Sequence, residues 1–207
     1  MTYQSKHTLM KWSKEGYNTV AKEYKNYHTY LNTFDIEYIK KYFPRGKENI
    51  SIIDLGAGDG RLYPLLNKLP HIRYVACDIS EQLLKQHPGT KNIEKILCNL
   101  EETLPFKDES FDFAITCFVL EHLPDSDHFF QEGQRILKIG ARRVLNYFPQ
   151  RHEFLRNNKN NPLKIQLYNH RIENLVKDAE NNWFTVDNFH IKEKGHIMGY
   201  ILVLEKN

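Results

Sequence analysis

The sequence has no long apolar run. None of its apolar stretches approaches the roughly 20 residues that a membrane-spanning helix needs, and the start, MTYQSKHTLMKW, lacks the apolar core of a signal peptide. Only three cysteines are present, Cys77, Cys98 and Cys117, without a C-x-x-C pair. Because they lie in or beside apolar runs, we predict reduced, buried thiols rather than disulfides or metal ligands. Together these absences predict a cytoplasmic protein.

The sequence also lacks an excess of one charge. The 29 Lys and Arg residues are scattered and nearly balanced by 26 Asp and Glu residues, which leaves a net charge of +3. A nucleic-acid-binding face needs a basic stripe, so we find no clear signal for a nucleic acid or for a membrane as a partner. No internal repeat or low-complexity segment divides the 207 residues, which indicates a single domain.

Apolar residues recur first at helical spacing and then in short runs. The spacing predicts helices over residues 17–31 and 36–43, the second ending at Pro44–Gly46. From residue 50 onward, short strands alternate with helices; the strands are 50–55, 72–77, 93–98, 111–117 and 142–148, and the helices are 61–69, 80–87 (capped by Ser80), 126–138 and 170–180 (capped by Asn169). This alternation predicts an α/β fold with a doubly wound, mostly parallel sheet. Two final runs predict a hairpin around Lys194–Gly195, which adds an antiparallel edge.

Three glycines follow the first strand in IIDLGAGDGRL (52–62). Glycines at this place let a ligand approach the backbone beside a helix N-terminus, which is typical of nucleotide-type sites. A dinucleotide fingerprint would place a glycine where Arg61 stands, so the spacing argues against a nicotinamide oxidoreductase, and a phosphate loop is absent as well. The negative charges of Asp54 and Asp59 favour a ligand with a positive charge near this loop. Asp78 ends the second strand, at a place where a carboxylate can hydrogen-bond to the hydroxyl groups of a ribose.

With these motifs, the chain resembles the class I S-adenosylmethionine-dependent methyltransferases. The glycine loop looks like their first motif and VACDIS (75–80) like the second. CNLEETLPFKDESFDFAITCFVLEHLPD (98–125) looks like the third and fourth motifs, in the style of the ubiquinone/menaquinone-type small-molecule branch, and GYNTVAKEY (16–24) is similar to the N-terminal helix. The resemblance implies a Rossmann-like, seven-stranded fold over residues 1–207. It also implies a helical lid over 1–45, a core over 46–207, and S-adenosylmethionine as cofactor.

The same resemblance implies roles at the methionyl end of the cofactor. The backbone of the glycine loop would hold this end, through Gly56, Ala57, Gly58 and Gly60. Asp54 and the Cys117 carbonyl would face the ammonium group. The alternative for Asp54 is simple ordering of the loop.

At the other end of the cofactor, Asp78 would bind the ribose and Ile79 would pack on the adenine. Asn99, at a position where the family commonly has Asp, would contact the adenine amino group. The backbone N–H of Leu100 would donate to adenine N1. Asp78 could instead cap the following helix. Tyrosines of such a helix more often pack in the core or the lid than contact a ligand. Tyr17 and Tyr24 are the candidates to cover the cofactor, because the family folds this helix over it.

Methyl transfer needs alignment and exclusion of water, and it needs a general base only if the acceptor must lose a proton. Candidates near the strand ends are Glu121, His122, Tyr147 and His152, of which we predict His122 and Tyr147 as catalytic residues. A structural hydrogen bond is the alternative for His122. No cluster has the spacing of a metal site.

Two segments depart from the family pattern or lack periodicity. Arg142 and Arg143 enter a strand that is normally apolar, after the unusual turn LKIGA (137–141). The polar segment 149–169 has no period and would form a substrate loop over the acceptor pocket.

The chain is too short for a separate RNA- or protein-recognition domain, which favours a small-molecule acceptor. Alternatives are an RNA or protein methyltransferase of this fold and a non-catalytic binding or scaffold protein.

Overall fold

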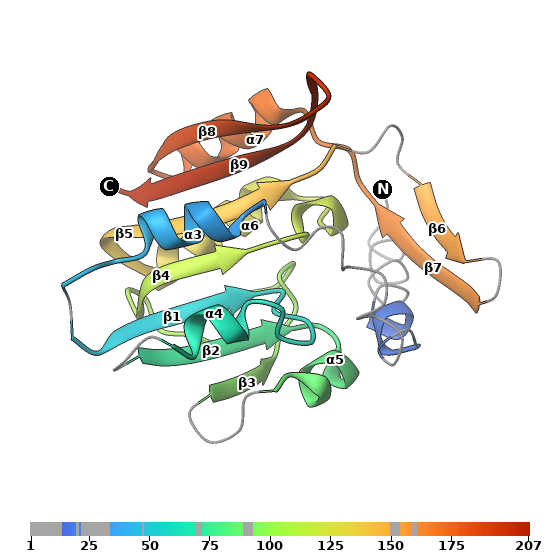
Figure 1. Ribbon diagram of the computed structural model, residues 1–207, viewed down its shortest axis with the longest axis horizontal. Helices are drawn as coiled ribbons and strands as arrows, with labels where there is room; N and C mark the ends of the chain where they lie inside the picture. The colour runs from blue at the N-terminus through green and yellow to red at the C-terminus, as the bar shows by residue number, and fades with distance from the viewer. Residues whose placement is uncertain are drawn as a thin grey trace.

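In the computed structural model, the described residues are 14–19, 21, 34–46, 48–68, 72–88, 93–149, 154–158 and 161–207. Their centre is a seven-stranded sheet in the order β3-β2-β1-β4-β5-β9-β8 (Figure 1). The strands are β1 (Ile50–Leu55), β2 (Ile72–Asp78), β3 (Ile93–Leu97), β4 (Phe111–Thr116), β5 (Leu137–Tyr147), β8 (Phe184–Glu193) and β9 (His196–Lys206). β1 to β5 pair in parallel, whereas β9 is antiparallel to both neighbours. This topology confirms the predicted fold class.

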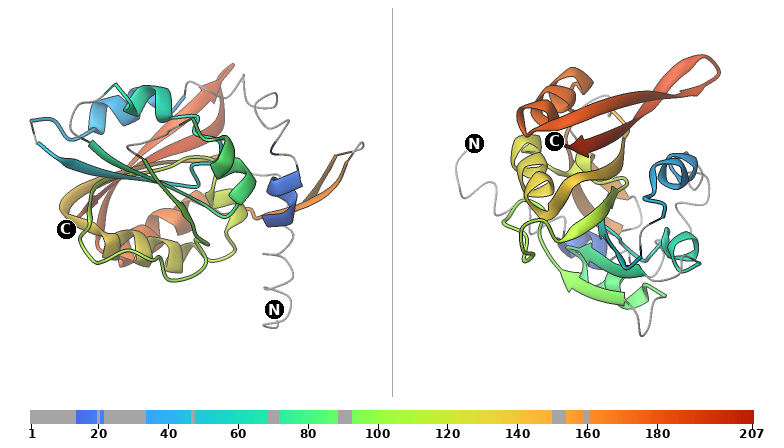
Figure 2. Two further views of the ribbon diagram at one scale, coloured as in Figure 1. Left: turned by 90° about the horizontal axis from the view of Figure 1, so that it is seen from below. Right: turned by 90° about the vertical axis from the view of Figure 1, so that its left-hand side faces the viewer.

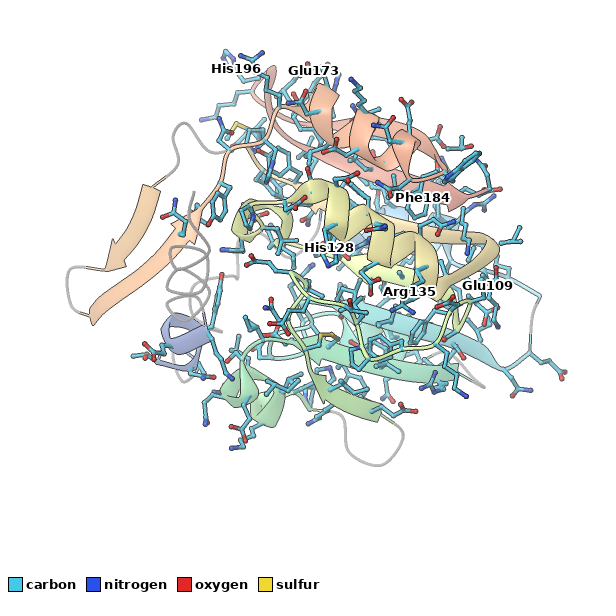
Figure 3. All side chains as sticks on the ribbon, turned by 180° about the vertical axis from the view of Figure 1, so that it is seen from behind. Glu109, His128, Arg135, Glu173, Phe184 and His196 are labelled. Carbon is cyan, nitrogen blue, oxygen red and sulfur yellow. A yellow bond between two sulfur atoms is a disulfide. The ribbon has the colours of Figure 1, made fainter. Side chains whose placement is uncertain are left out.

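Helices cover both faces of the sheet because alternate residues of each strand point to opposite sides. One face packs against α3 (Ile36–Tyr42) and α4 (Tyr63–Leu66), and the other against α6 (Ser126–Ile136) and α7 (Ile172–Asn181) (Figures 1 and 2). α5 (Glu81–Gln86) follows β2 and contacts β2 and β3. Figure 3 views the α6–α7 face, with Arg135 near the end of α6 and the buried Phe184 at the start of β8. No described helix is long and apolar enough to cross a bilayer.

Several predicted boundaries shift. The helix expected over 61–69 is confined to Tyr63–Leu66, with its proline in the first turn as expected. Ser80 caps α5 as predicted, since its Oγ accepts a hydrogen bond from the Leu83 N–H at 3.2 Å. The predicted cap of α7 is wrong: the helix begins after Arg171, and no side chain caps it. The hairpin at Lys194–Gly195 is confirmed, and both turn residues have positive φ angles.

The two adjacent arginines lie on opposite faces of β5, which begins at Leu137 rather than at residue 142. Arg142 is about half exposed and pairs with Glu205 at 2.7 Å. Arg143 is completely buried, with its guanidinium 3.9 Å from the centre of the Phe129 ring. A side chain at Gly133 of α6 would collide with this guanidinium, so a glycine in the helix makes room for the buried arginine.

The segment expected as an irregular loop over 149–169 contains regular structure. β6 (Phe154–Asn158) and β7 (Asn161–Leu167) form a separate antiparallel pair. Figures 1 and 2 show this pair extending away from the main sheet. In β7, Leu163, Ile165 and Leu167 alternate with polar residues, a strand signal that the prediction of an irregular loop did not use.

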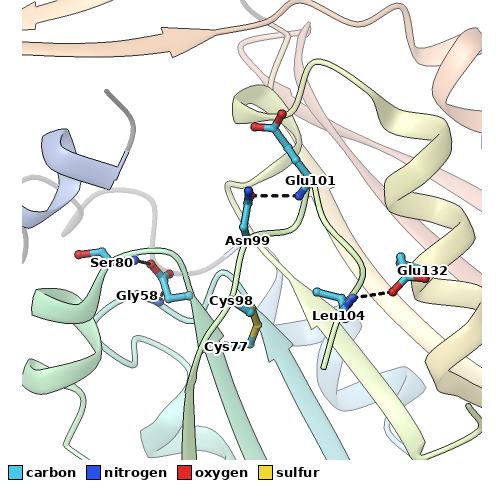
Figure 4. Close-up of a disulfide and its surroundings, with 9 residues drawn as sticks. Gly58, Cys77, Ser80, Cys98, Asn99, Glu101, Leu104 and Glu132 are labelled. Atoms are coloured by element: carbon cyan, nitrogen blue, oxygen red, sulfur yellow. Dashed lines mark hydrogen bonds between the residues drawn. A yellow bond between two sulfur atoms is a disulfide. The ribbon is translucent and has the colours of Figure 1, made fainter. Parts of the chain in front are cut away.

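The prediction of reduced thiols is wrong for two of the three cysteines. Cys77, at the end of β2, and Cys98, just after β3, are joined in a disulfide (Figure 4). Their Cα atoms are 5.9 Å apart, which suits such a bond. Cys117 is free and buried, as predicted. The two cysteines are 21 residues apart in the sequence, and they meet only because β2 and β3 are neighbours in the sheet. The sequence alone therefore did not predict the disulfide.

Candidate functional site

A pocket of about 690 Å³, partly open to solvent, lies at the carboxyl ends of β1, β2 and β4. At this edge the chain passes from β1 to β2 on one side and later returns to β4 on the other side, so the strand order reverses there and a crevice is left. The lining residues are Tyr17, Gly56, Gly58, Asp78, Ile79, Leu83, Asn99, Leu100, Glu101, Cys117, Phe118, Val119, His122 and Leu123. Nine of the residues predicted from the sequence are among them.

The glycine loop forms one wall of the pocket. The N–H groups of Gly56 and Ala57 both donate to the Cys77 carbonyl, at 2.8 and 3.0 Å, which holds the start of the loop against β2. A Cβ atom at Gly56, where φ is +80°, would lie 2.2 Å from a methyl group of Val119. Only glycine therefore allows the loop and the turn after β4 to meet at this place.

Ala57 and Gly60, although predicted to bind the cofactor, do not line the pocket. Gly60 has a φ of +84°, and a Cβ atom there would lie 2.6 Å from the His87 ring. Its function in the fold is to make room for His87, which is buried against Tyr63 and Tyr74.

Asp78 connects the glycine loop to α5. One carboxylate oxygen accepts the Gly58 N–H and the other the Ser80 N–H, each at 2.8 Å (Figure 4). Burial raises the pKa of Asp78 to about 6, although the backbone hydrogen bonds counteract part of this effect. Each oxygen keeps a lone pair, so the carboxylate can still accept hydroxyl groups from the pocket side.

Asn99 and Leu100 line the pocket beside Asp78, beyond the end of β3. The Asn99 side-chain oxygen accepts the Glu101 N–H at 3.1 Å, and its amide donates to Glu102 at 3.1 Å. These bonds fix the orientation of the Asn99 amide, and Figure 4 shows the one to Glu101. Glu101 also lines the pocket, which the sequence reasoning did not predict.

A buried polar cluster lies behind the pocket, between the glycine loop and the turn after β4. Arg61 forms a two-pronged ion pair with Asp35, which is fully buried. Asn146 of β5 donates to Asp35 at 3.2 Å and accepts the Phe118 N–H at 2.6 Å. This bond helps to hold Phe118 in the left-handed conformation, with φ at +60°, where it lines the pocket. Asp35, Asn146 and Phe118 were missed because no local pattern marks their contacts.

Asp54 belongs to this cluster rather than to the pocket lining. It is buried, and burial raises its pKa to about 7. The Tyr74 hydroxyl donates to its carboxylate at 2.8 Å, which lowers the pKa in part. Cys117 lies nearby and lines the pocket, so the two groups predicted to face a cation are brought together.

The helical segment 14–19 spans the pocket from α5 to the 3-10 turn η1 (Leu120–His122). The Tyr17 hydroxyl is 2.8 Å from Nε2 of His122, and their rings meet edge to face. On the other side, Oδ1 of Asn18 accepts the Ser80 hydroxyl at 2.7 Å and the Gln82 N–H at 3.1 Å. Tyr24 and His152 lie outside the described residues.

Tyr147, the second predicted catalytic residue, is not brought to the pocket. It is fully buried in the core that includes residues of α6 and α7, and it is not among the lining residues. Its hydroxyl lies 2.8 Å from the His170 carbonyl and accepts the His170 N–H at 2.6 Å, so it fixes the chain before α7. Glu121, a neighbour of His122, is also buried, and burial raises its pKa to about 7.

Residues 53–145 match the family model described as a methyltransferase domain. The ubiquinone/menaquinone biosynthesis C-methyltransferase of Hahella chejuensis is 31% identical over 125 residues, which cover 54% of this chain and 50% of the relative. Residues 53–145 of this chain are therefore similar to methyltransferase domains. The chain spans about half the length of the curated relatives that it matches.

Solved methyltransferase structures share the fold. The S-adenosylmethionine-dependent methyltransferase of Methanosarcina mazei superposes with a TM-score of 0.66 at 22% identity, covering 82% of this chain and 96% of the other. A complex of DhpI with S-adenosylhomocysteine superposes with a TM-score of 0.74 at 17% identity, covering 96% and 97%. At these identities the likeness concerns the fold alone.

The pocket fits S-adenosylmethionine as cofactor. Gly56 and Gly58 form a cradle that a side chain at Gly56 would disturb, and Asp78 faces the pocket with an acceptor for hydroxyl groups. Behind the cradle, the buried Asp54 carboxylate suits the positive charge of the amino-acid end.

Proposed function

We propose that this chain transfers a methyl group to a small-molecule acceptor. The observation that carries the proposal is one pocket that is lined both by residues predicted to bind the cofactor and by the Tyr17–His122 pair. A concave pocket of this kind suits a small reacting group better than a folded macromolecule. Curated relatives that act in ubiquinone/menaquinone biosynthesis support a small acceptor.

S-adenosylmethionine supplies an electrophilic methyl group on a sulfonium sulfur. The residues of the chain bind, orient and exclude water: the glycine loop and Asp54 hold the amino-acid end, Asp78 holds the ribose, and segment 14–19 covers the pocket. Where the methyl-accepting group must lose a proton, the proposed role of His122 is to take up that proton at Nε2. The hydrogen bond between Nε2 and the Tyr17 hydroxyl is then given up. Tyr17 then orients the imidazole.

Calorimetric titration with S-adenosylmethionine and S-adenosylhomocysteine, with NAD as control, tests the cofactor part. We expect micromolar binding of the first two and none of NAD. A screen of small molecules with a labelled methyl group then tests the activity. Transfer to RNA or protein but to no small molecule would contradict the proposal. A His122→Asn variant that keeps full activity would contradict the proton-accepting role of His122.

The lid role of residues 1–45 and the acceptor role of residues 149–169 stay predictions. The same holds for a cytoplasmic location. The Cys77–Cys98 disulfide weighs against that location, because disulfides are rare in cytosolic proteins.

A further inference from the structure

The Asp54 carboxylate has less hydrogen bonding than a buried charge needs. It is 2% exposed, and in the described part of the chain the Tyr74 hydroxyl is the one donor that reaches it, at 2.8 Å. An ionised carboxylate offers about four acceptor sites. Because unsatisfied buried charge is costly, this carboxylate favours a further donor that is positively charged.

Tyr74 reaches Asp54 because of the register between β1 and β2. Asp54 lies opposite Ala76, and Tyr74 lies opposite Ile52, so Tyr74 and Asp54 are diagonal neighbours on one face. An aromatic side chain can span this diagonal, and the small Ala76 leaves room for the ring.

The Tyr74 ring has little freedom to turn its hydroxyl elsewhere. The residue is 1% exposed, and its ring packs against His87 and Tyr63 at centroid distances of 5.8 and 6.5 Å. Gly60 makes room for His87, as described above. The position of the hydroxyl is therefore set by packing, before any ligand binds.

The charges around Asp54 leave the cluster negative. Asp35 and Asp78 raise the pKa of Asp54, whereas Arg61 lowers it. Arg61 is already paired with Asp35. The Cys117 thiol, whose pKa burial raises well above its usual value, and His87, whose pKa burial lowers to about 4, are uncharged at neutral pH. A cation on the ligand would supply the positive charge that the described residues lack.

We propose that Tyr74 is a positioning residue: it holds the Asp54 carboxylate behind the glycine loop, where the negative charge attracts the ammonium group of the cofactor's amino-acid end without lining the pocket. Affinity then depends on that end of the ligand through a residue that does not touch the ligand itself. The inference rests on the cofactor-binding role proposed for Asp54.

The test compares Tyr74→Phe with the unaltered chain toward two ligands. S-adenosylhomocysteine carries the amino-acid end, and 5′-methylthioadenosine lacks it. We expect Tyr74→Phe to weaken S-adenosylhomocysteine binding about tenfold, the effect of one hydrogen bond to a charged group. Binding of 5′-methylthioadenosine should stay within about twofold. Because the Tyr74 hydrogen bond lowers the pKa of Asp54, the pH below which S-adenosylhomocysteine affinity falls should also move upward in the variant.

Tyr63→Phe is the matched control. It removes a hydroxyl from the same ring cluster, but that hydroxyl bonds to Asn67 at the surface, so neither ligand should be affected. In an Asp54→Asn background, Tyr74→Phe should cause no further loss, because both changes remove the same interaction.

Unchanged S-adenosylhomocysteine binding, or an equal loss for both ligands, would overturn the role of Tyr74. Failure of the unaltered chain to bind either ligand would overturn that role together with the cofactor assignment. A chain that shows the expected binding pattern and yet methylates no small molecule would overturn only the proposed function, since this test needs no acceptor.

Discussion

Replacing the buried Arg143 by methionine should stabilise the protein. The guanidinium is fully buried, its Nη1 has no hydrogen-bond partner among the described residues, and burial lowers its pKa from the usual arginine value to about 9. This lowering of the pKa corresponds to a cost of roughly 5 kcal/mol for folding with the guanidinium charged. The cation–π contact with Phe129 stabilises the folded protein by about 2 kcal/mol, and the hydrogen bonds to Thr116 stabilise it by about 1 kcal/mol. The net gain expected from Arg143→Met is therefore about 2 kcal/mol.

Thermal unfolding of the two proteins at pH 7 tests this magnitude. For a chain of this length, about 2 kcal/mol raises the melting temperature by roughly 4–8 °C. Because the pKa of Arg143 is lowered in the folded protein, the full free-energy cost of the buried charge applies below about pH 9 and declines as the pH rises further. The stability difference between the two proteins should therefore shrink above pH 9.

Arg142→Met provides the control, since this neighbour is about half exposed and paired with Glu205. That pair is worth at most about 1 kcal/mol. A lower melting temperature for Arg143→Met than for the unaltered protein would show that Arg143 has a stabilising partner and would refute the reasoning.

The remaining predictions concern the cofactor pocket and the thiols. Asp78→Ala should weaken S-adenosylhomocysteine binding by about 1–3 kcal/mol in titration calorimetry, because its carboxylate holds the Gly58 N–H as well as facing the ribose; equal affinity in a folded variant would remove Asp78 from the site. Gly58→Val should abolish binding in the same assay, since φ is +56° there and the side chain would fill the cradle; normal binding would contradict the loop assignment. Affinity should fall as the pH drops through about 7, because protonation removes the charge of Asp54; a flat pH profile would argue against its facing a cation. A thiol titration of the denatured, non-reduced protein should find one free cysteine, since Cys77 and Cys98 are joined; three would disprove the disulfide.

The local sequence determined the elements and the motif that carries the site. Periodicity placed β1 to β4 within a residue of their observed ends, and glycine spacing located the cradle at Gly56 and Gly58. These features follow from short-range rules, since strand alternation, helix capping and positive φ angles depend on neighbouring residues. The position of Asp78 at the end of β2 was likewise readable, because parallel strands end at one edge.

Only the tertiary structure decided which distant groups meet. Asp35 and Asn146 are 111 residues apart and yet share a hydrogen bond. Tyr74 reaches Asp54 through strand register, and Tyr147 is buried in the core instead of lining the pocket. The physical reason is common to these cases: side-chain partners across a sheet are fixed by register and packing, and one residue of shift would move each side chain to the other face.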